Sequence, residues 1–207
     1  MPVEKRRELL LESAFRVIAS RGVDGATTRA ISAEAGVTLS TFHYVFASRD
    51  DLLAALVTRG TDTELAVIAT ALGAAAAGAE RGPGGIRIML QESLSGYIDG
   101  VVADPGREQA MISLNQYARQ TSGLAELGAN MYQRYYDAIA DGLDVAADQA
   151  GVRWDRPTAE LAPLVVAATD GITLAYLNTR DRGICDRIAE ATVTLMLGHV
   201  DTTTDHR

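Results

Sequence analysis

The side chains best suited to recognising another molecule are concentrated between residues 27 and 49. Hydroxyl, imidazole, phenol and guanidinium groups form hydrogen bonds with phosphate oxygens and with the edges of bases. A leucine among them could pack against the methyl group of thymine. The candidate nucleic-acid contacts are Thr27, Thr28, Arg29, Thr38, Leu39, Ser40, Thr41, His43, Tyr44 and Arg49.

Two short helices joined by a tight turn are expected to carry these side chains. Thr27 is a hydroxyl N-cap for the first helix, and Gly36 ends that helix where a left-handed backbone is easiest. Thr38 can cap the second helix, whose Phe42 and Phe46 would face the core. Such helix–glycine–helix corners are also common in other all-α proteins, so the corner alone does not establish nucleic-acid binding.

The order of residues in this stretch is more specific than its helical pattern. The run Ala35 to Thr38, the pair Thr41-Phe42 and the run Phe46 to Leu53 resemble the N-terminal signature of the TetR/AcrR family of transcriptional regulators. The resemblance covers about residues 5 to 56. It departs at one point, because the family's recognition helix usually carries Tyr before His and here the order is His43-Tyr44.

The resemblance implies an all-α fold in which a three-helix DNA-binding head carries a larger helical body. The head would span residues 1–48, and residues 49–207 would bind an effector and dimerise. Base edges would be read by Leu39, Ser40 and Thr41, while Thr38 would serve either as a cap or as a contact. The side chains assigned mainly to phosphates are Thr27, Thr28, Arg29, His43, Tyr44 and Arg49.

Acidic and basic side chains are distributed unevenly along the chain. The formal net charge is −8, which argues against a general affinity for nucleic acid. Residues 1–50 nevertheless hold seven Lys/Arg against six Asp/Glu, whereas the remaining 157 residues hold 12 against 21. An acidic body would repel DNA while a locally basic head approaches it, so DNA should meet one end of the molecule.

The rest of the chain shows helical periodicity and no segment with the period of a β-strand. We expect about nine helices in all, including the two short ones. The Ala/Gly-rich segment Ala71 to Gly85 is expected to be a frayed helix end and a loop, and Asp201 to Arg207 a polar tail. The other helices are expected over about residues 3–20, 48–68, 83–103, 107–119, 124–150, 157–176 and 184–196.

The resemblance also implies a small-molecule effector pocket enclosed by the fifth to eighth helices. A ligand cavity needs adaptable apolar side chains with a few polar groups, although each such residue is equally compatible with a helical core. Asp170 is the most specific candidate, because an acid in an apolar stripe must be hydrated, paired or hydrogen-bonded. It would suit a cationic or hydroxylated hydrophobic ligand, or pair with a nearby Arg or Tyr. The candidates are Tyr97, Met111, Leu114, Asn115, Met131, Tyr132, Tyr135 and Asp170.

The last two helices each carry an apolar stripe that could join two copies of the chain. One head reads only a few base pairs, so useful specificity requires two heads on a roughly palindromic site. We therefore expect a homodimer through the eighth and ninth helices, with part of each stripe serving the core of one subunit. The stripes consist of Leu161, Leu164, Val165, Ala168, Ile172, Ala175 and Tyr176, and of Ile184, Ile188, Ala191, Leu195 and Met196.

The helix beginning after Ser48 would connect the head to the body. A displacement at its far end would change the spacing of the two recognition helices on DNA. The family resemblance favours antagonism between ligand and DNA, which would make the protein a ligand-relieved repressor. An activator is the alternative, because no residue in the sequence distinguishes the two.

Catalytic chemistry has no support in the motifs of the chain. His43, His199 and His206 are too dispersed for a metal site, and Cys185 has no nearby histidine in the sequence. The sequence contains no nucleophile elbow, phosphate-binding loop or zinc-protease motif. We expect no catalytic residue, metal ion or cofactor. Two alternatives stay open, an enzyme without a recognisable motif and a helical dimer that binds a protein partner through its head.

Three further observations bear on where the protein works. The single cysteine cannot form an internal disulfide, no apolar run reaches membrane-spanning length, and the N-terminus lacks the apolar core of a signal peptide. We therefore expect a cytoplasmic protein without membrane contact. Its expected partners are double-stranded operator DNA, a small-molecule effector and a second copy of the chain.

Overall fold

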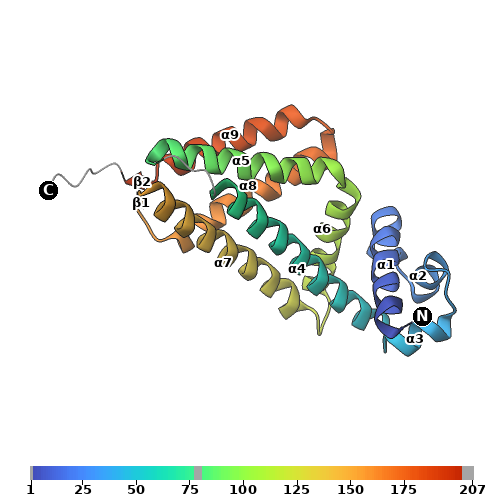
Figure 1. The fold of residues 1–207 in the computed structure, drawn as a ribbon. Helices are drawn as coiled ribbons and strands as arrows, with labels where there is room; N and C mark the ends of the chain where they lie inside the picture. The colour runs from blue at the N-terminus through green and yellow to red at the C-terminus, as the bar shows by residue number, and fades with distance from the viewer. Residues whose placement is uncertain (1, 77–80, 202–207) are drawn as a thin grey trace. The chain divides into compact units, whose positions relative to one another are not determined.

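Helices account for nearly all of the secondary structure (Figure 1). A computed structural model of the chain describes residues 2–76 and 81–201. Within these residues there are nine α-helices and one pair of two-residue strands, which confirms the all-α prediction. The helices are α1 (Val3–Gly25), α2 (Thr28–Glu34), α3 (Leu39–Val45), α4 (Arg49–Ala76), α5 (Pro83–Ala103), α6 (Pro105–Gln120), α7 (Ala125–Ala150), α8 (Thr158–Thr179) and α9 (Arg182–Leu197).

The chain forms two compact units, each drawn from two stretches of sequence. Unit 1 consists of Met1–Thr63 and Asp104–Tyr132, and unit 2 of Glu64–Ala103 and Gln133–Arg207. Helices α4 and α7 therefore contribute to both units. In unit 1, α6 packs against α1, although the sequence assigned α6 to the body. The boundary predicted after residue 48 is a functional one and stays a prediction.

The first helix is longer than predicted. Gly22 takes a φ of 70°, which breaks α1 close to its predicted end at Ser20, and one further helical turn then reaches Gly25. Glycine adopts this left-handed φ without steric cost. Upstream of the break, α1 supplies much of the core of unit 1 through Leu10, Leu11, Ala14, Val17 and Ile18.

Local hydrogen bonds determine α2 and α3. The Thr27 hydroxyl accepts a 3.1 Å bond from the amide of Ala30, and the Thr38 hydroxyl accepts a 3.2 Å bond from the amide of Thr41. Gly36, with a φ of 63°, forms the turn between the two helices. Both caps and the glycine turn agree with the prediction from the sequence.

The start of α4 carries the predicted capping pair. The hydroxyl of Ser48 accepts a 3.0 Å bond from the amide of Asp51, and the carboxylate of Asp51 accepts a 3.0 Å bond from the amide of Ala47. These reciprocal bonds fix the connection between α3 and α4. Phe42 on α3 and Phe46 at its C-cap are both fully buried.

Two other helix boundaries differ from the expected ones. Helix α4 continues to Ala76, so part of the Ala/Gly-rich segment is helical. Helix α6 begins at Pro105 because Asp104 caps it and proline fits its first position. The remainder of the expected loop at 77–80, and the expected polar tail from residue 202 onward, lie outside the described residues.

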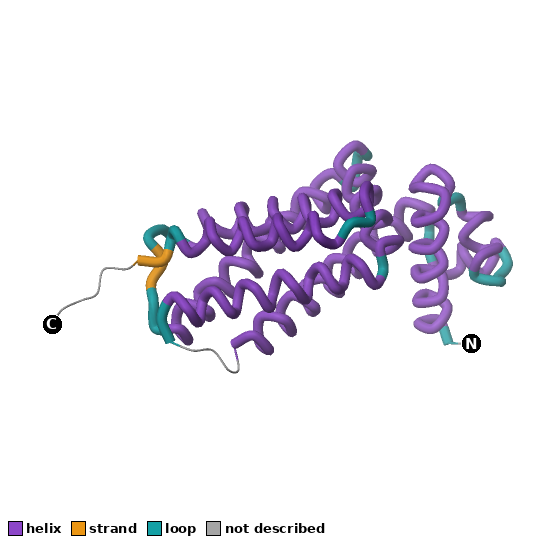
Figure 2. The backbone as a smooth tube through the Cα atoms, turned by 90° about the horizontal axis from the view of Figure 1, so that it is seen from above, coloured by secondary structure: helices purple, strands orange, loops and turns teal. Residues whose placement is uncertain are grey.

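Helices α5, α8 and α9 pack together in unit 2 (Figures 1 and 2). Their shared contacts bury apolar side chains in separate clusters. One cluster brings α9 onto α8 and α5, and another joins α8 and α9 to α7. The first contains Leu94, Ile98, Ile172, Cys185, Ala189 and Val193, and the second Leu143, Leu161, Val165 and Met196.

One pair of short antiparallel strands was missed by the sequence analysis. β1 (Arg153–Trp154) pairs with β2 (Val200–Asp201) near the end of the described chain, in orange in Figure 2. The indole of Trp154 also donates a 2.9 Å hydrogen bond to the carbonyl of Leu143. Two residues are too few to show an alternating pattern, so this pair is compatible with a sequence that has no strand-period segment.

Helix α8 is long and apolar enough to cross a membrane by length and composition. The expectation that no apolar segment reaches this length was therefore wrong. About a third of the most apolar 18-residue stretch of α8 is buried in the structure. Leu161, Val165 and Ile172 of this helix pack inside unit 2. Packing against α5, α7 and α9 accounts for these buried residues of α8.

Candidate nucleic-acid interface

Helix α3 has one side in the core and another in solvent. Phe42 is fully buried, whereas Leu39 is 37% exposed and Tyr44 68% exposed. The exposed side therefore presents apolar, hydroxyl, imidazole and phenol groups together, which is the mixture that base and phosphate recognition requires. The solvent-facing residues are Leu39, Ser40, His43 and Tyr44, with Thr41 half-buried at the edge.

Three hydroxyl groups form a connected cluster at the start of α3. The Thr38 oxygen lies 2.8 Å from the Ser40 oxygen and 2.9 Å from the side-chain oxygen of Thr41. Thr38 is therefore both the helix cap and the shared partner of two predicted base contacts. Because hydroxyl hydrogens rotate, Ser40 and Thr41 can replace these bonds with bonds to a base edge.

The first turn of α2 carries the other predicted group of contacts. Thr27 is exposed, with its oxygen engaged as the cap, and Thr28 is half-buried. Arg29 is exposed, and within the described part of the chain it forms no ion pair. Its positive charge is therefore available for a phosphate.

Arg49 is bound within the protein. Its guanidinium group donates hydrogen bonds to the carbonyl of Ala26 at 2.8 Å, the carbonyl of Val23 at 2.5 Å and the phenol of Tyr117 at 2.8 Å. Its side chain is only 24% exposed. Arg49 therefore joins the α1–α2 connection to α6 inside unit 1. This structural role competes with the phosphate contact that the family resemblance assigned to Arg49.

The beginning of α1 lies against α3 and its C-cap. The guanidinium carbon of Arg7 is 4.7 Å from the ring centroid of Phe46, and that of Arg6 is 6.0 Å from the ring centroid of Tyr44. From the sequence, Lys5, Arg6 and Arg7 were expected only to add positive charge to the head. Contact between segments distant in sequence leaves no periodic signal, so these residues could not be placed beside α3.

Four of the eight predicted effector contacts are packed inside unit 1. The side-chain amide of Asn115 donates a 3.3 Å bond to the carbonyl of Gly128 and lies 3.9 Å from the sulfur of Met131, which links α6 to α7. A side chain at Gly60 would collide with the sulfur of Met111, so α4 and α6 approach closely there. The four residues with this packing role are Met111, Leu114, Asn115 and Met131, each between 1% and 6% exposed.

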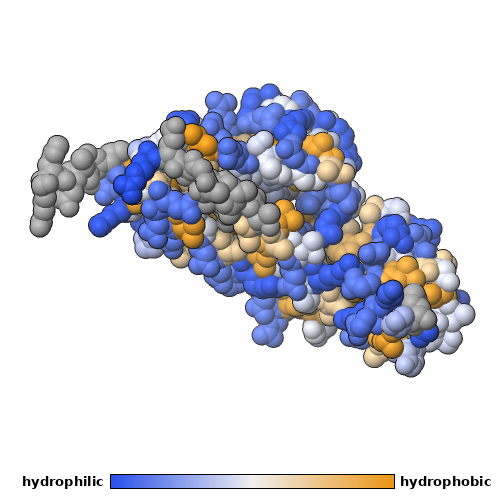
Figure 3. Space-filling view, in the orientation of Figure 1, coloured by the Kyte–Doolittle hydropathy of each residue, from blue (hydrophilic) through white to orange (hydrophobic). Residues whose placement is uncertain are grey.

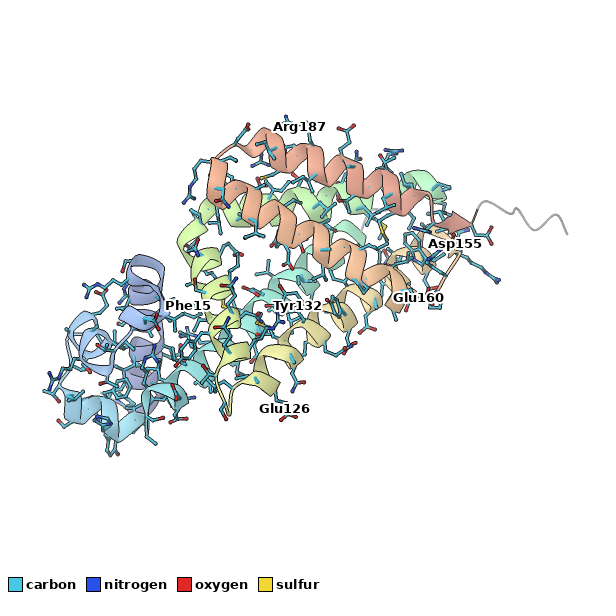
Figure 4. The ribbon with its side chains drawn as sticks, turned by 180° about the vertical axis from the view of Figure 1, so that it is seen from behind. Phe15, Glu126, Tyr132, Asp155, Glu160 and Arg187 are labelled. Carbon is cyan, nitrogen blue, oxygen red and sulfur yellow. The ribbon has the colours of Figure 1, made fainter. Side chains whose placement is uncertain are left out.

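Charged groups at the start of α6 are partly buried. The guanidinium carbon of Arg107 lies 5.3 Å from the ring centroid of Phe15 on α1 (Figure 4). Burial raises the pKa of Glu108 above its ordinary value. The charge of Arg107 opposes this increase and that of Asp104 adds to it. A carboxyl with this pKa shift is less stable in its charged form than it would be in water.

The other four predicted effector contacts are half-buried. Tyr132 lies at the end of the α7 segment of unit 1 and is labelled in Figure 4. In unit 2, the phenol of Tyr97 lies 2.6 Å from the hydroxyl of Thr173, and the phenol of Tyr135 donates a hydrogen bond to the carboxylate of Glu64. These three and Asp170 complete the predicted set as Tyr97, Tyr132, Tyr135 and Asp170.

Two surface grooves lie outside the predicted effector residues. One, of about 440 Å³, lies between residues 23–24 and α6 in unit 1. The other, of about 240 Å³, lies between α5 and α9 in unit 2. Neither groove is lined by any of the eight predicted contacts.

The described residues offer little support for metal binding or for nucleophilic catalysis. Among them, no group of three or more His, Cys, Asp or Glu side chains is arranged to hold a metal ion. Cys185 is fully buried, and burial raises the pKa of its thiol, so the nucleophilic thiolate is disfavoured. The face drawn in Figure 3 is mostly hydrophilic, with apolar residues in small patches.

The residues around α2 and α3 match a known family. A family model described as "Bacterial regulatory proteins, tetR family" matches residues 10–56, which include both helices completely. These comparisons support a TetR-family transcriptional regulator. The transcriptional regulator PksA of Bacillus subtilis is 45% identical over 51 residues, a match that covers 25% of this chain and 25% of PksA.

Two similarities extend over nearly the whole chain. The nicotine-responsive transcriptional repressor HdnoR of Paenarthrobacter nicotinovorans is 23% identical over 190 residues, which covers 90% of this chain and 93% of HdnoR. A solved structure of a TetR-family regulator from Mesorhizobium loti superposes with a TM-score of 0.77 at 15% identity, covering 98% of this chain and 100% of that one. The structural match extends the family fold to α4–α9.

Similarity to known regulators distinguishes between the classes of function considered from the sequence. The protein is a transcriptional regulator and not an enzyme. TetR-family regulators bind DNA and small-molecule effectors and typically form dimers. The solvent-facing side of α3 is therefore the candidate nucleic-acid interface.

Proposed function

We propose that this regulator is a ligand-responsive repressor. As a cytoplasmic homodimer it would bind a palindromic DNA operator, and a small-molecule effector would release it. The observation that carries the proposal is the exposed side of α3, where Leu39, Ser40 and Thr41 stand on a helix anchored by the buried Phe42. This combination supports direct reading of bases in a major groove.

The proposal divides the DNA contacts between base recognition and phosphate binding. Leu39 packs against a thymine methyl group, while Ser40 and Thr41 exchange their bonds with Thr38 for bonds to base edges. Arg49 is left out of the phosphate set because its donors bind protein oxygens. The phosphate contacts are Thr27, Thr28, Arg29, His43 and Tyr44.

Binding to duplexes that the protein selects from a random-sequence library tests this division. Replacing Leu39, Ser40 and Thr41 together by alanine should change the ranking of the selected duplexes. Arg29→Ala should weaken binding to all of them and lower the salt slope by about 0.9 per head. Ser20→Ala, which removes an exposed hydroxyl on α1, is the matched control. An equal loss on every duplex after the triple replacement would refute base reading by α3.

The homodimer is proposed to form through the outward side of α8 and α9. Leu164 and Leu174 on α8 are 39% and 49% exposed, and Leu195 on α9 is 49% exposed. Between the two leucines of α8, a side chain at Gly171 would meet no atom within 4 Å, so another helix could approach closely there. Four helices, two from each copy, would bury these leucines. The stripe residues that serve unit 2 instead are Leu161, Val165, Ile172 and Met196.

The effector site is proposed to lie in unit 2. Its polar groups are Tyr97, Tyr135 and Asp170, with the carboxylate of Glu64 bonded to Tyr135. Two carboxylates in a partly apolar setting favour a cationic ligand with a hydrophobic body. The relative HdnoR is described as nicotine-responsive, and nicotine is an amine of this class.

A thermal-shift screen of hydrophobic amines, with nicotine included, tests the site. Asp170→Asn and Tyr135→Phe should reduce the shift caused by any amine that stabilises the wild-type protein. Asp148→Asn, which neutralises an exposed acid on α7, is the control. Unchanged shifts in both site variants would exclude these residues from the effector site.

Repression and release require that effector and operator weaken each other's binding. HdnoR is described as a repressor, which supports this sign. A coupling of about 1.4 to 3 kcal/mol corresponds to a change in affinity of roughly 10- to 150-fold, and it must be the same in both directions. Titration of the effector against operator-bound and unbound protein measures it. Tighter effector binding in the presence of operator would indicate a ligand-assisted DNA binder instead.

A further inference from the structure

The first turns of α1 hold two arginines in different settings. The guanidinium of Arg7 lies over the ring of Phe46, which is fully buried. That of Arg6 lies 6.0 Å from the ring centroid of Tyr44, which is 68% exposed. Both arginines are half-buried, but Arg7 lies beside a core residue, whereas Arg6 lies beside a solvent-facing residue of α3.

Arg6 also differs from other arginines of unit 1 in its partners. Arg16 binds the carboxylate of Glu34 at 2.8 Å, and Arg59 binds that of Glu8 at 2.7 Å. In the part of the chain that the structure describes, Arg6 forms no ion pair and no side-chain hydrogen bond. Helix α3 contributes no acidic residue of its own that could neutralise Arg6. Its positive charge is thus available to an anion that approaches α3.

We propose that Arg6 and Tyr44 together hold one DNA backbone phosphate at the edge of each half-site. The inference rests on the proposed DNA-binding function of α3. A guanidinium that lies near an aromatic ring and forms no ion pair keeps its planar fork available for two parallel bonds to phosphate oxygens. The phenol of Tyr44 can donate a third bond to the same phosphate. A weak cation–π attraction at 6.0 Å would favour this position of the guanidinium before DNA arrives, and the interface would extend from α3 to the first helix of the chain.

This arrangement makes the salt dependence of DNA binding sensitive to Arg6. With a duplex that the wild-type protein selects from a random-sequence library, Arg6→Gln should lower the slope of log association constant against log salt by about 0.9 per head. Arg21→Gln removes an exposed charge from the same helix about 22 Å away and should leave the slope unchanged. Arg6→Lys keeps the charge and should retain the slope while losing affinity, because lysine cannot make the paired bonds.

Duplexes with a single phosphate replaced by an uncharged methylphosphonate identify the contact itself. The wild-type protein should lose affinity when one phosphate at the edge of a half-site is replaced, and Arg6→Gln should be insensitive to that same replacement. Equal salt slopes for wild type and Arg6→Gln, or equal losses at every phosphate in both proteins, overturn the contact. A wild-type protein that selects no duplex at all overturns the proposed function, and the contact with it.

Discussion

Two exposed surfaces of this regulator have opposite chemistry. The exposed side of α3 carries hydroxyl, imidazole and phenol groups around a single leucine, Leu39. The large hydrophobic side chains that α8 and α9 expose are all leucines, namely Leu164, Leu174 and Leu195, and they lie among exposed charged residues such as Arg187 and Glu190. Polar groups can exchange water for phosphates and bases, whereas apolar groups gain free energy only when another apolar surface displaces their water. The contrast agrees with the two proposed partners, nucleic acid for α3 and a second copy of the chain for α8 and α9.

The two surfaces are also supported differently. Helix α3 has only seven residues and depends on the Thr38 cap and the buried Phe42. Helices α8 and α9 have 22 and 16 residues and are held by apolar clusters on their inward sides. A single substitution at the buried anchor of α3 should therefore lower the stability of the protein. A single substitution at an outward leucine of α8 should instead weaken the proposed dimer.

The largest effect is expected at the anchor of α3. Phe42→Ala should lower the free energy of unfolding by about 3–5 kcal/mol, because it removes a large, fully buried side chain. Leu39→Ala, on the exposed side of the same helix, should change stability by less than about 0.5 kcal/mol. Urea unfolding followed by circular dichroism measures both values. Equal losses in the two variants would mean that both residues are structural, which would remove Leu39 from the base contacts.

A charge introduced among the exposed leucines of α8 and α9 should weaken the proposed homodimer. Leu174→Glu and Leu195→Glu should each raise the dissociation constant of the homodimer at least about 100-fold, because an unpaired carboxylate would be buried in the interface. Val67→Glu, at a 60% exposed apolar position on α4, controls for the added charge. Sedimentation velocity at micromolar concentrations measures the association. A wild-type protein that sediments as a monomer would contradict the dimer, and unaffected variants would contradict this interface.

Arg49 tests whether a charged residue near α3 serves the fold or the DNA. Arg49→Ala should lower the free energy of unfolding by about 2 kcal/mol, because two carbonyl groups and a phenol lose a charged donor. Tyr117→Phe removes one of the three acceptors and should have a smaller effect. Arg21→Ala, an exposed arginine of α1, is the control. If Arg49→Ala keeps full stability and lowers the salt slope of DNA binding, Arg49 contacts phosphate as the family resemblance suggested.

The sequence was sufficient for α2 and α3 because their determinants are local. Thr27, Gly36 and Thr38 fix the caps and the turn through bonds within a few residues, and the sequence displays them directly. Predicting the effector contacts would require knowing which distant helices pack together, and this is not visible in the local sequence. Met111 and Leu114 were candidates for an effector cavity or for a helical core, and the sequence does not reveal which helices they face; both are buried in unit 1.

The smallest predicted effect concerns Glu108, whose charged carboxylate is disfavoured by burial in unit 1. Burial raises the pKa of Glu108 in the folded protein, so the folded state binds more protons than the unfolded state between the two pKa values. The free energy of unfolding should therefore fall as the pH rises from the ordinary value of 4.5 through the raised pKa.

Glu108→Gln removes this titration and should flatten that part of the pH profile. It should also make the protein more stable than wild type at any pH above the raised pKa, where the buried carboxylate is charged in the wild type and the amide is neutral. Glu126→Gln, at an exposed acid in the first turn of α7 (Figure 4), controls for the loss of one negative charge. Urea unfolding between pH 4 and pH 8 measures the profiles. A Glu108→Gln profile parallel to that of the wild type would show that Glu108 is solvated like an exposed acid, and that the polar groups at the start of α6 add no pH dependence to unit 1.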